Sequence, residues 1–249
     1  MGVHATPVRT LQAVLLLCSS LTVMSGATIA PALPSIAAHF EAHPHADLLV
    51  RLVLTIPALF IGIGAPFAGV FLERYGRLPV LKLGIALYAL AGSAPLWITP
   101  VVAHLLPWLP EWLDALAFIL LSRALLGVSV AALMTATTTL AGDYFQGETR
   151  NRFLGAQGSF MAFGGVVFIS MGGWLASVSW EAPFALYALS ITLLPAAYRI
   201  LYEPEKSQNV EGQHPNKAAS KKDRVNWSRL FPIYFAGFFG MMMFYAIPT

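Results

Sequence analysis

Residues 52–81 read LVLTIPALFIGIGAPFAGVFLERYGRLPVL. The first part of this stretch, Leu52–Leu72, carries no charged side chain, and a helix of that length can cross the ~30 Å hydrocarbon core of a bilayer. Glu73, Arg74 and Arg77 follow at once. An uncharged apolar run that ends in a charged turn is typical of a membrane span followed by a short loop in water.

Uncharged apolar runs recur along the whole chain, and most of them are long enough to span. The runs are Thr10–Phe40, Leu52–Leu72, Leu83–Pro110, Ala124–Gly142, Phe153–Trp180, Ala182–Tyr198 and Leu230–Thr249. Hydrophobic residues make up 57% of the chain and charged residues 11%, whereas soluble domains carry about 25% charged residues. The sequence therefore predicts an all-α membrane protein with several spans and excludes a soluble domain.

Basic residues fall on alternate connections, which predicts the orientation. Lys and Arg in short loops tend to stay in the cytoplasm. With the N-terminus cytoplasmic, every Lys and Arg except Arg51 and Arg123 lies on the cytoplasmic side. The opposite orientation would place nearly all of them outside, and we reject it. We expect a multi-pass protein of the plasma (bacterial inner) membrane with a cytoplasmic N-terminus.

The first run has an alternative interpretation as a cleaved signal peptide. Arg9 precedes an apolar core, and small residues follow at 25–27. The apolar stretch continues to Ile36, beyond the length of a signal core, and cleavage would invert the charge distribution. We therefore expect a retained first helix. Cys18, the only cysteine, lies within it and can form no disulfide inside the chain.

The apolar runs and the prolines predict where six helices begin and end. The expected helices are 11–34, 48–71, 79–98, 115–141, 153–176 and 182–202. Pro100, Pro107 and Pro110 lie in the stretch 99–112, which we expect to be an external loop or surface segment, because proline interrupts a helix.

The same pattern predicts three parts of the chain. A six-helix transmembrane bundle is expected over residues 1–202. The polar, mixed-charge residues 203–229 are typical of a flexible cytoplasmic linker. A seventh transmembrane helix is expected over 230–249.

The loop after the second run resembles the signature loop of the major facilitator superfamily. That loop places a glycine, an acid–arginine pair and then Gly-Arg between helices 2 and 3. The residues that carry the resemblance are Gly69, Arg74, Gly76, Arg77 and Leu81. Two positions depart from the pattern, since Glu73 stands where the family usually has Asp and Leu78 where it often has Lys or Arg. The resemblance implies a cytoplasmic latch that holds one conformation of the alternating-access cycle.

The chemistry of this loop can also be stated from its residues. Gly76 permits the left-handed conformation of a tight turn, and Arg77 can then bridge to carboxylates nearby. The loop after the fourth helix resembles the corresponding family loop, and we expect its Asp143 or Glu148 to pair with Arg74 or Arg77. The alternative is a short loop whose basic residues only set the orientation.

The fourth helix resembles the Arg-x-x-x-Gly segment of the superfamily at Arg123 and Gly127. An arginine inside a span costs on the order of 2.5–3.5 kcal/mol unless it is paired or hydrated. One interpretation is structural: Arg123 reaches outwards or binds carbonyls of the first helix. The other, implied by the resemblance, is proton coupling or contact between helices 1 and 4. The sequence leaves both open.

The fifth helix resembles in part the glycine-rich helix of proton-driven drug exporters. Gly155, Gly164, Gly172 and Gly173 fall at matching spacing, but Phe168-Ile169 stands where the exporters have Gly-Pro. The glycines predict a smooth face for close helix packing. The segment Ala30–Ile36 with Phe40 is also similar to the end of the first helix in the drug:proton branch.

Small and polar side chains in the first, fourth and fifth helices are the candidates for substrate contact. They are Thr22, Ser25, Thr28, Thr135, Thr138, Gln157, Ser159 and Met161. Gln157 is the strongest, because an amide inside a span needs a partner. Each has an alternative role as a hydrogen-bonding residue between helices. No Asp or Glu lies inside a run, so these runs supply no proton carrier.

Other chemistries find little support. His39, His43 and His45 could hold a metal by spacing, but a solvated loop is the better interpretation. The sequence contains no phosphate-binding loop and no nucleophile elbow. We expect no enzymatic activity, no catalytic residue, no cofactor, no metal and no nucleic-acid partner.

The resemblance implies a fold of two halves, each a six-helix bundle built from two inverted three-helix repeats, with the substrate held between the halves. This sequence supplies the N-terminal bundle and the seventh helix, so we expect it to be truncated and to lack the C-terminal half. The predicted function is secondary active transport in the lipid bilayer, with efflux of small amphiphilic compounds against proton entry. The alternatives are import of a metabolite or sugar by the same fold, and a non-transporting truncated membrane protein.

Overall fold

The computed structural model describes residues 8–41, 46–105, 115–204 and 235. The chain divides into two compact units, Met1–Glu205 and Lys206–Thr249. Apart from residue 235, every described residue belongs to the first unit. The predicted linker from residue 205 onwards and the predicted seventh helix otherwise lie outside the described residues.

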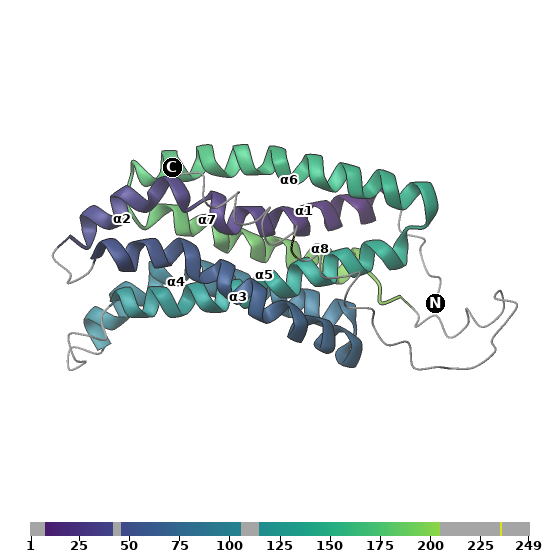
Figure 1. Ribbon diagram of the computed structural model, residues 1–249, viewed down its shortest axis with the longest axis horizontal. Coiled ribbons are helices and arrows are strands. Elements are labelled where there is room, and N and C mark those ends of the chain that lie inside the picture. The colour runs from purple at the N-terminus through teal and green to yellow at the C-terminus, as the bar shows by residue number, and fades with distance from the viewer. Residues whose placement is uncertain (1–7, 42–45, 106–114, 205–234, 236–249) are drawn as a thin grey trace, which may run out of the picture. The chain divides into compact units, whose positions relative to one another are not determined.

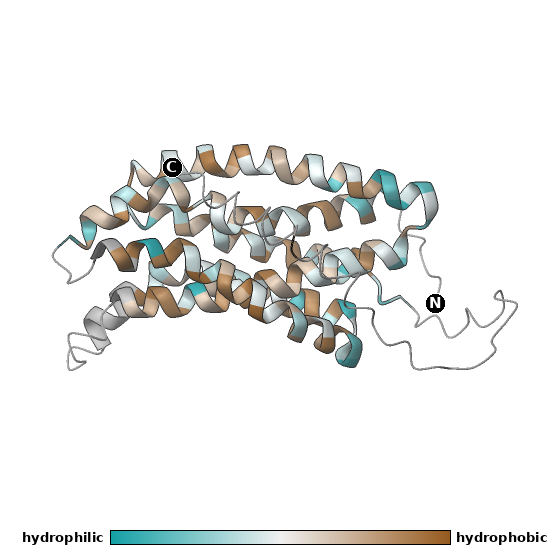
Figure 2. Ribbon diagram, viewed as in Figure 1, coloured by the Kyte–Doolittle hydropathy of each residue, from teal (hydrophilic) through white to brown (hydrophobic). Residues whose placement is uncertain are grey.

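In the part of the chain that the structure describes, all regular elements are helices, and six stretches have the length and hydropathy of membrane spans. The elements are α1 (Val8–Ala27), η1 (Ala30–Ala32), α2 (Leu33–His39), α3 (Ala46–Tyr75), α4 (Arg77–Leu105), α5 (Ala115–Tyr144), α6 (Gly147–Ala176), η2 (Ala182–Phe184), α7 (Ala185–Ala188), η3 (Leu189–Thr192) and α8 (Leu193–Ile200). The long helices run side by side as a bundle (Figure 1). Hydrophilic residues gather towards its two ends (Figure 2). The predicted all-α membrane fold is confirmed.

Prolines divide the first span without ending it. α1 stops at Ala27, a short 3₁₀ turn follows at Ala30–Ala32, and α2 then continues to His39. Pro31 and Pro34 occupy the first turns of η1 and α2, where a helix needs no backbone N–H from its residue. The span therefore reaches beyond the predicted end at residue 34.

The third span corrects a prediction. Residues 99–112 were expected to form a loop or surface segment, but α4 continues through Pro100 to Leu105. A proline removes one backbone donor, and membrane helices tolerate this because neighbouring groups and local adjustments satisfy the freed carbonyl. Residues 106–112, including Pro107 and Pro110, lie outside the described residues.

The sixth span is wound more tightly than the predicted single helix 182–202. It alternates between 3₁₀ and α geometry through η2, α7, η3 and α8, and its helix ends at Ile200. Pro183 opens η2, and Pro195 lies in the first turn of α8, where a backbone N–H would have no partner within the helix.

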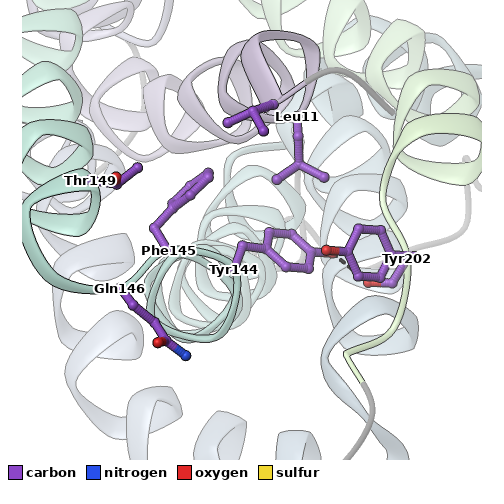
Figure 3. A pocket seen from close by; sticks show the side chains of 7 residues that line it. Leu11, Tyr144, Phe145, Gln146, Thr149 and Tyr202 are labelled. Carbon is purple, nitrogen blue, oxygen red and sulfur yellow. Dashed lines mark hydrogen bonds between the residues drawn. The ribbon is translucent and has the colours of Figure 1, made fainter. Parts of the chain in front are cut away.

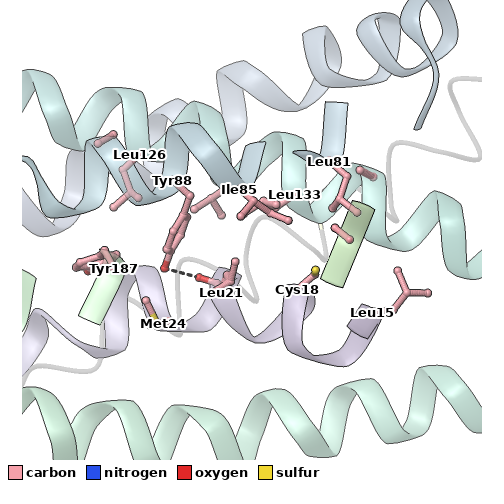
Figure 4. Packing of buried hydrophobic residues seen from close by; sticks show 14 of the residues in the cluster. Leu15, Cys18, Leu21, Met24, Leu81, Ile85, Tyr88, Leu126, Leu133 and Tyr187 are labelled. Atoms are coloured by element: carbon pink, nitrogen blue, oxygen red, sulfur yellow. Dashed lines mark hydrogen bonds between the residues drawn. The ribbon is translucent and has the colours of Figure 1, made fainter. Parts of the chain in front are cut away.

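Aromatic hydroxyl groups tie the core of the bundle to α1 (Figure 4). The Tyr88 hydroxyl on α4 donates to the Leu21 carbonyl at 2.8 Å, and the Tyr187 hydroxyl on α7 donates to the Ser25 carbonyl at 2.8 Å. Both tyrosines are fully buried. Since an unmade hydrogen bond is costly inside an apolar bundle, these two bonds fix the position of α1 against α4 and α7. α6 packs mainly on α1, and most of its side chains are exposed.

Candidate functional site

Basic residues collect at one end of the bundle, which we call the basic end. There α3 and α5 finish and α4 and α6 begin, on the right of Figure 1. Its basic residues are Arg9, Arg74, Arg77, Lys82, Arg150, Arg152 and Arg199.

The turn between α3 and α4 has the geometry that the sequence predicts. Gly76 has φ +97°, a left-handed conformation that side chains rarely adopt. Its N–H donates to the Leu72 carbonyl at 3.0 Å and closes the last turn of α3. Glu73 and Arg74 are exposed, and the Arg74 guanidinium lies 5.4 Å from the centre of the Tyr75 ring.

Arg77 pairs with Asp143, as predicted for this loop. The Arg77 Nε atom lies 3.0 Å from Asp143 Oδ2, with 23% and 29% of the two side chains exposed. The ion pair joins the start of α4 to the end of α5. Glu148 takes no part in it, because its carboxylate pairs with Arg152 one turn further along α6 at 2.6 Å.

Glu203 completes the cluster, and sequence reasoning missed it. Its carboxylate accepts hydrogen bonds from the backbone N–H of Arg77 at 2.6 Å and of Leu78 at 2.7 Å. These are the first N–H groups of α4, which have no partner within the helix, and a negative charge there also meets the positive end of the helix dipole. No local pattern could show this contact, because Glu203 follows the sixth span and is distant in sequence. We call Gly76, Arg77, Asp143 and Glu203 the latch cluster.

Glu203 gives Gly76 a second reason to be glycine. A Cβ atom built at Gly76 would lie 2.9 Å from Glu203 Oε1 and 3.1 Å from its Cδ. Only a residue without a side chain lets the carboxylate approach the turn. Gly69, by contrast, faces open space, with nothing within 4 Å of such a Cβ.

Arg123 lies fully buried in the middle of the bundle. Its Nη2 atom donates to the carbonyls of Ala91 at 3.1 Å and Gly92 at 2.7 Å. Its guanidinium carbon lies 5.0 Å from the centre of the Phe184 ring and 5.2 Å from that of Tyr187, distances at which aromatic faces attract a cation. The prediction that Arg123 reaches outwards or binds carbonyls of the first helix was wrong. The carbonyls belong to α4.

A proline explains why α4 offers a carbonyl to Arg123. The in-helix donor for the Ala91 carbonyl would be the N–H of residue 95, which is Pro95 and has none. The carbonyl is therefore open to a partner from α5. Two other polar atoms of the guanidinium, Nε and Nη1, have no hydrogen-bond partner.

Glycines allow the helices to meet around Arg123. A Cβ at Gly127 would lie 2.7 Å from Phe60 Cβ and 2.5 Å from the Pro57 carbonyl oxygen, so this glycine permits the close contact of α5 with α3. A Cβ at Gly92 would overlap the Tyr187 side chain. Such close backbone approach is the usual role of small residues in membrane bundles.

The predicted glycine face of α6 is divided in two. Gly172 lies against the Thr28 carbonyl, and a Cβ at Gly173 would lie 3.6 Å from Pro31 Cβ. Gly164 is in ordinary contact with Ser20. These glycines pack on the first span, whereas Gly155 has nothing within 4 Å of a built Cβ.

The candidate substrate residues make mostly local hydrogen bonds. The hydroxyl groups of Thr22, Ser25 and Thr135 each donate to a carbonyl of their own helix, at 2.7, 2.7 and 2.8 Å. Gln157 differs, because its Nε2 donates across to Ser19 Oγ on α1 at 2.7 Å. Met161 is half-buried.

The remaining candidates vary in environment. Thr28 is fully buried and its hydroxyl oxygen has no hydrogen-bond partner. Thr138 and Ser159 are exposed, and Ser159 donates to the Gly155 carbonyl at 3.2 Å.

A cavity of about 420 Å³ opens at the basic end (Figure 3). It lies between the start of α1, the end of α5, the start of α6 and the segment after α8. The lining residues are Val8, Leu11, Tyr144, Phe145, Gln146, Thr149 and Tyr202. The Tyr144 hydroxyl donates to the Tyr202 carbonyl across it. None of the predicted substrate residues lines this cavity.

His39 packs against aromatic rings. Its imidazole stacks on the Trp180 ring with centroids 4.5 Å apart and meets Phe40 edge-on. His43 and His45 lie outside the described residues. Among the residues that are described, no group of three His, Cys, Asp or Glu side chains is close enough to hold a metal ion.

Comparison with known families decides the fold family. The family described as Major Facilitator Superfamily matches residues 15–249. This chain belongs to the major facilitator superfamily. The match covers the latch cluster, Arg123 and the glycines of α6, so the resemblance of the signature loop is confirmed at the level of the superfamily.

Drug-resistance proteins are among the relatives that this chain resembles. Multidrug resistance protein 1 of Bacillus subtilis is 27% identical over 175 residues, which cover 70% of this chain and 40% of that protein. The class H tetracycline resistance protein of Pasteurella multocida is 23% identical over 243 residues, covering 95% of this chain and 56% of that protein. The chain thus spans about half the length of these relatives.

A solved superfamily structure shares the fold. The crystal structure of a D-xylose-proton symporter matches with a TM-score of 0.68 at 18% identity, over 79% of this chain and 49% of the symporter. At this identity the match shows the architecture of the bundle.

Proposed function

We propose that this chain is part of a secondary active transporter that exports small amphiphilic compounds in exchange for protons. The observation that carries the proposal is the latch cluster, whose Gly76 and Arg77 lie in the signature loop of a superfamily chain with drug-resistance proteins among its relatives. The basic end faces the cytoplasm of a bacterium, and the protein lies in the inner membrane.

The latch cluster suits an element that closes and opens. Arg77, Asp143 and Glu203 join three segments of the bundle at one end, and the ion pair is partly exposed. Partly exposed ion pairs contribute only about 0–1 kcal/mol. The cluster therefore biases the closed state of the basic end by a small free energy, which substrate binding can overcome.

Proton coupling needs a group that titrates. Every Asp and Glu among the described residues lies at a helix end or in a connection. Asp143 is the described carboxylate that pairs with Arg77, so under this proposal it lies at the contact that breaks when the basic end opens. Arg123 holds α5 against α4 during the cycle, because both of its carbonyl partners belong to α4.

The test is transport by membranes that contain the protein expressed from its complete gene. Everted vesicles that carry it are expected to accumulate ethidium when respiration energises them, and an uncoupler is expected to abolish the accumulation. Vesicles from cells with an empty vector are the control. Equal accumulation in the two preparations would contradict export of this class of compound, and uptake by right-side-out vesicles would point to import.

A further inference from the structure

Ser19 and Gln157 form a polar contact between α1 and α6 within the membrane. Gln157 lies about 15 Å along α6 from its first residue, at 1.5 Å per residue. Its Nε2 atom donates to Ser19 Oγ at 2.7 Å. Ser19 is buried, whereas Gln157 is partly exposed. The contact therefore lies at the border between the packed interior and the open side of α6.

The hydrogen bonds of Ser19 fix which way the amide points. A serine hydroxyl has a single proton, and Ser19 gives it to the Leu15 carbonyl at 2.8 Å. Towards Gln157 the hydroxyl oxygen can then only accept. The amide must present its NH₂ group to Ser19, and its Oε1 atom faces away, with no partner among the described residues.

Neighbouring hydroxyl groups also donate their single proton to backbone carbonyls. Ser20 donates to the Leu17 carbonyl at 2.8 Å, and Thr22 donates to the Ser19 carbonyl at 2.7 Å. On α6, Ser159 donates to the Gly155 carbonyl at 3.2 Å. Serine and threonine in helices commonly spend their proton on a backbone carbonyl. What these side chains still offer to a ligand is oxygen lone pairs.

We propose that Ser19 is a positioning residue which orients the Gln157 amide so that Oε1 accepts a hydrogen bond from the transported compound. The site then prefers amphiphiles that carry an N–H or O–H donor over amphiphiles of equal charge without one. This inference rests on the proposed function, because it assigns a specificity to the same transport activity.

The experiment compares two probes of equal charge. Decylammonium has three N–H donors, and decyltrimethylammonium has none. Uptake of each radiolabelled probe into everted vesicles gives its KM and maximal rate, normalised to the amount of protein in the membrane. Ser19→Ala is expected to raise the KM for decylammonium about ten-fold, the lower limit for a hydrogen bond with a charged group, and to leave the KM for decyltrimethylammonium unchanged. Gln157→Leu is expected to raise the KM for decylammonium and to leave the KM for decyltrimethylammonium unchanged, whether or not Ser19 is replaced.

Ser20→Ala is the matched control, since it removes a hydroxyl from the same turn of α1 that bonds only within its own helix. It is expected to change neither KM. If Ser19→Ala and Gln157→Leu alter both probes by the same factor, or neither, the preference for donors is overturned while transport stands. If wild-type vesicles take up ethidium but show equal KM values for the two probes, the inference alone fails. If they take up none of the three compounds, the proposed function fails and the inference falls with it.

Discussion

Arg77 at the basic end of the bundle and Arg123 inside the bundle are held by different partners. Arg77 meets the carboxylate of Asp143 at 3.0 Å with about a quarter of its side chain exposed. Arg123 is fully buried and meets two carbonyls and two aromatic rings. No described acidic side chain forms a salt bridge with it.

This difference in partners indicates which arginine, Arg77 or Arg123, can break and re-form its contacts. At the basic end, water replaces a lost partner, so an ion pair there can break and reform at a cost of about 1 kcal/mol or less. In the interior, removing one partner of a buried charge costs about 3–5 kcal/mol. Arg77 is therefore suited to a cycle, and Arg123 to a permanent joint between α4 and α5.

The largest expected effect is overcrowding next to Arg123. Gly92→Val places side-chain atoms where Tyr187 lies, and we expect it to lower the free energy of unfolding by about 3 kcal/mol. Denaturant titration in detergent micelles measures this. Gly62→Val on α3 is the control, because nothing lies within 4 Å of its Cβ. Equal losses in the two variants would show that Gly92 is not a contact point.

The second prediction compares the stability cost of the same substitution, arginine to lysine, at Arg123 and at Arg77. Arg123→Lys is expected to lower the free energy of unfolding by about 2 kcal/mol, because an ammonium is more strongly hydrated and lacks the planar guanidinium that contacts the Phe184 and Tyr187 rings. Arg77→Lys is expected to cost less than about 1 kcal/mol, since its site is partly exposed. The same titration compares them, and a greater loss for Arg77 would reverse the comparison.

A substitution of Pro95 tests whether this proline frees the Ala91 carbonyl for Arg123. Arg123→Met removes the buried charge but leaves the Ala91 carbonyl without a donor, at an expected cost of about 1–2 kcal/mol. Pro95→Ala supplies an in-helix N–H to this carbonyl. In the Pro95→Ala background, Arg123→Met is therefore expected to cost about 1 kcal/mol less. Additive effects in the double variant would mean that the proline does not create the acceptor.

The third effect concerns the turn of the latch cluster. Gly76→Ala is expected to cost about 2 kcal/mol, from left-handed strain plus displacement of the Glu203 carboxylate. Gly147→Ala, at φ +54° with nothing near its Cβ, is expected to cost about 1 kcal/mol, from strain alone. Glu203→Ala should narrow the difference between the two, and the part that remains reflects the larger φ of Gly76. A difference that Glu203→Ala leaves unchanged would refute the second role of Gly76.

The smallest effect is the ion pair itself. Asp143→Asn and Arg77→Gln are expected to show a coupling of about 0.5–1 kcal/mol in a double-mutant cycle, and the coupling should fall as salt is added. Glu148 and Arg152, whose side chains are 78% exposed, form the control pair with a coupling of about 0.3 kcal/mol. If the coupling between Arg77 and Asp143 is no larger than that of the control pair, the ion pair does not stabilise the closed state of the basic end.

Much of the fold followed from the sequence because hydropathy has a length scale in a bilayer. The predicted helices 48–71 and 153–176 lie within the observed α3 and α6, which begin two and six residues earlier. Where the prediction failed, at 99–105, it applied a rule for proline that holds in water, whereas a helix in a membrane has no better alternative for its backbone.

Some contacts of the candidate site were likewise predictable from the sequence, and others were not. Gly76, Arg77 and Asp143 were predictable, because turn geometry and charge are local properties of two short loops. The partners of Arg123 were not, since they depend on which helix packs beside α5 and on a proline that frees a carbonyl there.

By itself, the amino-acid sequence determined that this protein crosses the membrane, how often the described part does so and where its charged turns lie, because those properties depend on the cost of burying charge in hydrocarbon. Only the tertiary structure decided which groups meet: Glu203 at the start of α4, Arg123 against α4, and Gln157 against Ser19. Each of these contacts joins segments distant in the chain, so its energy depends on packing that no local pattern records.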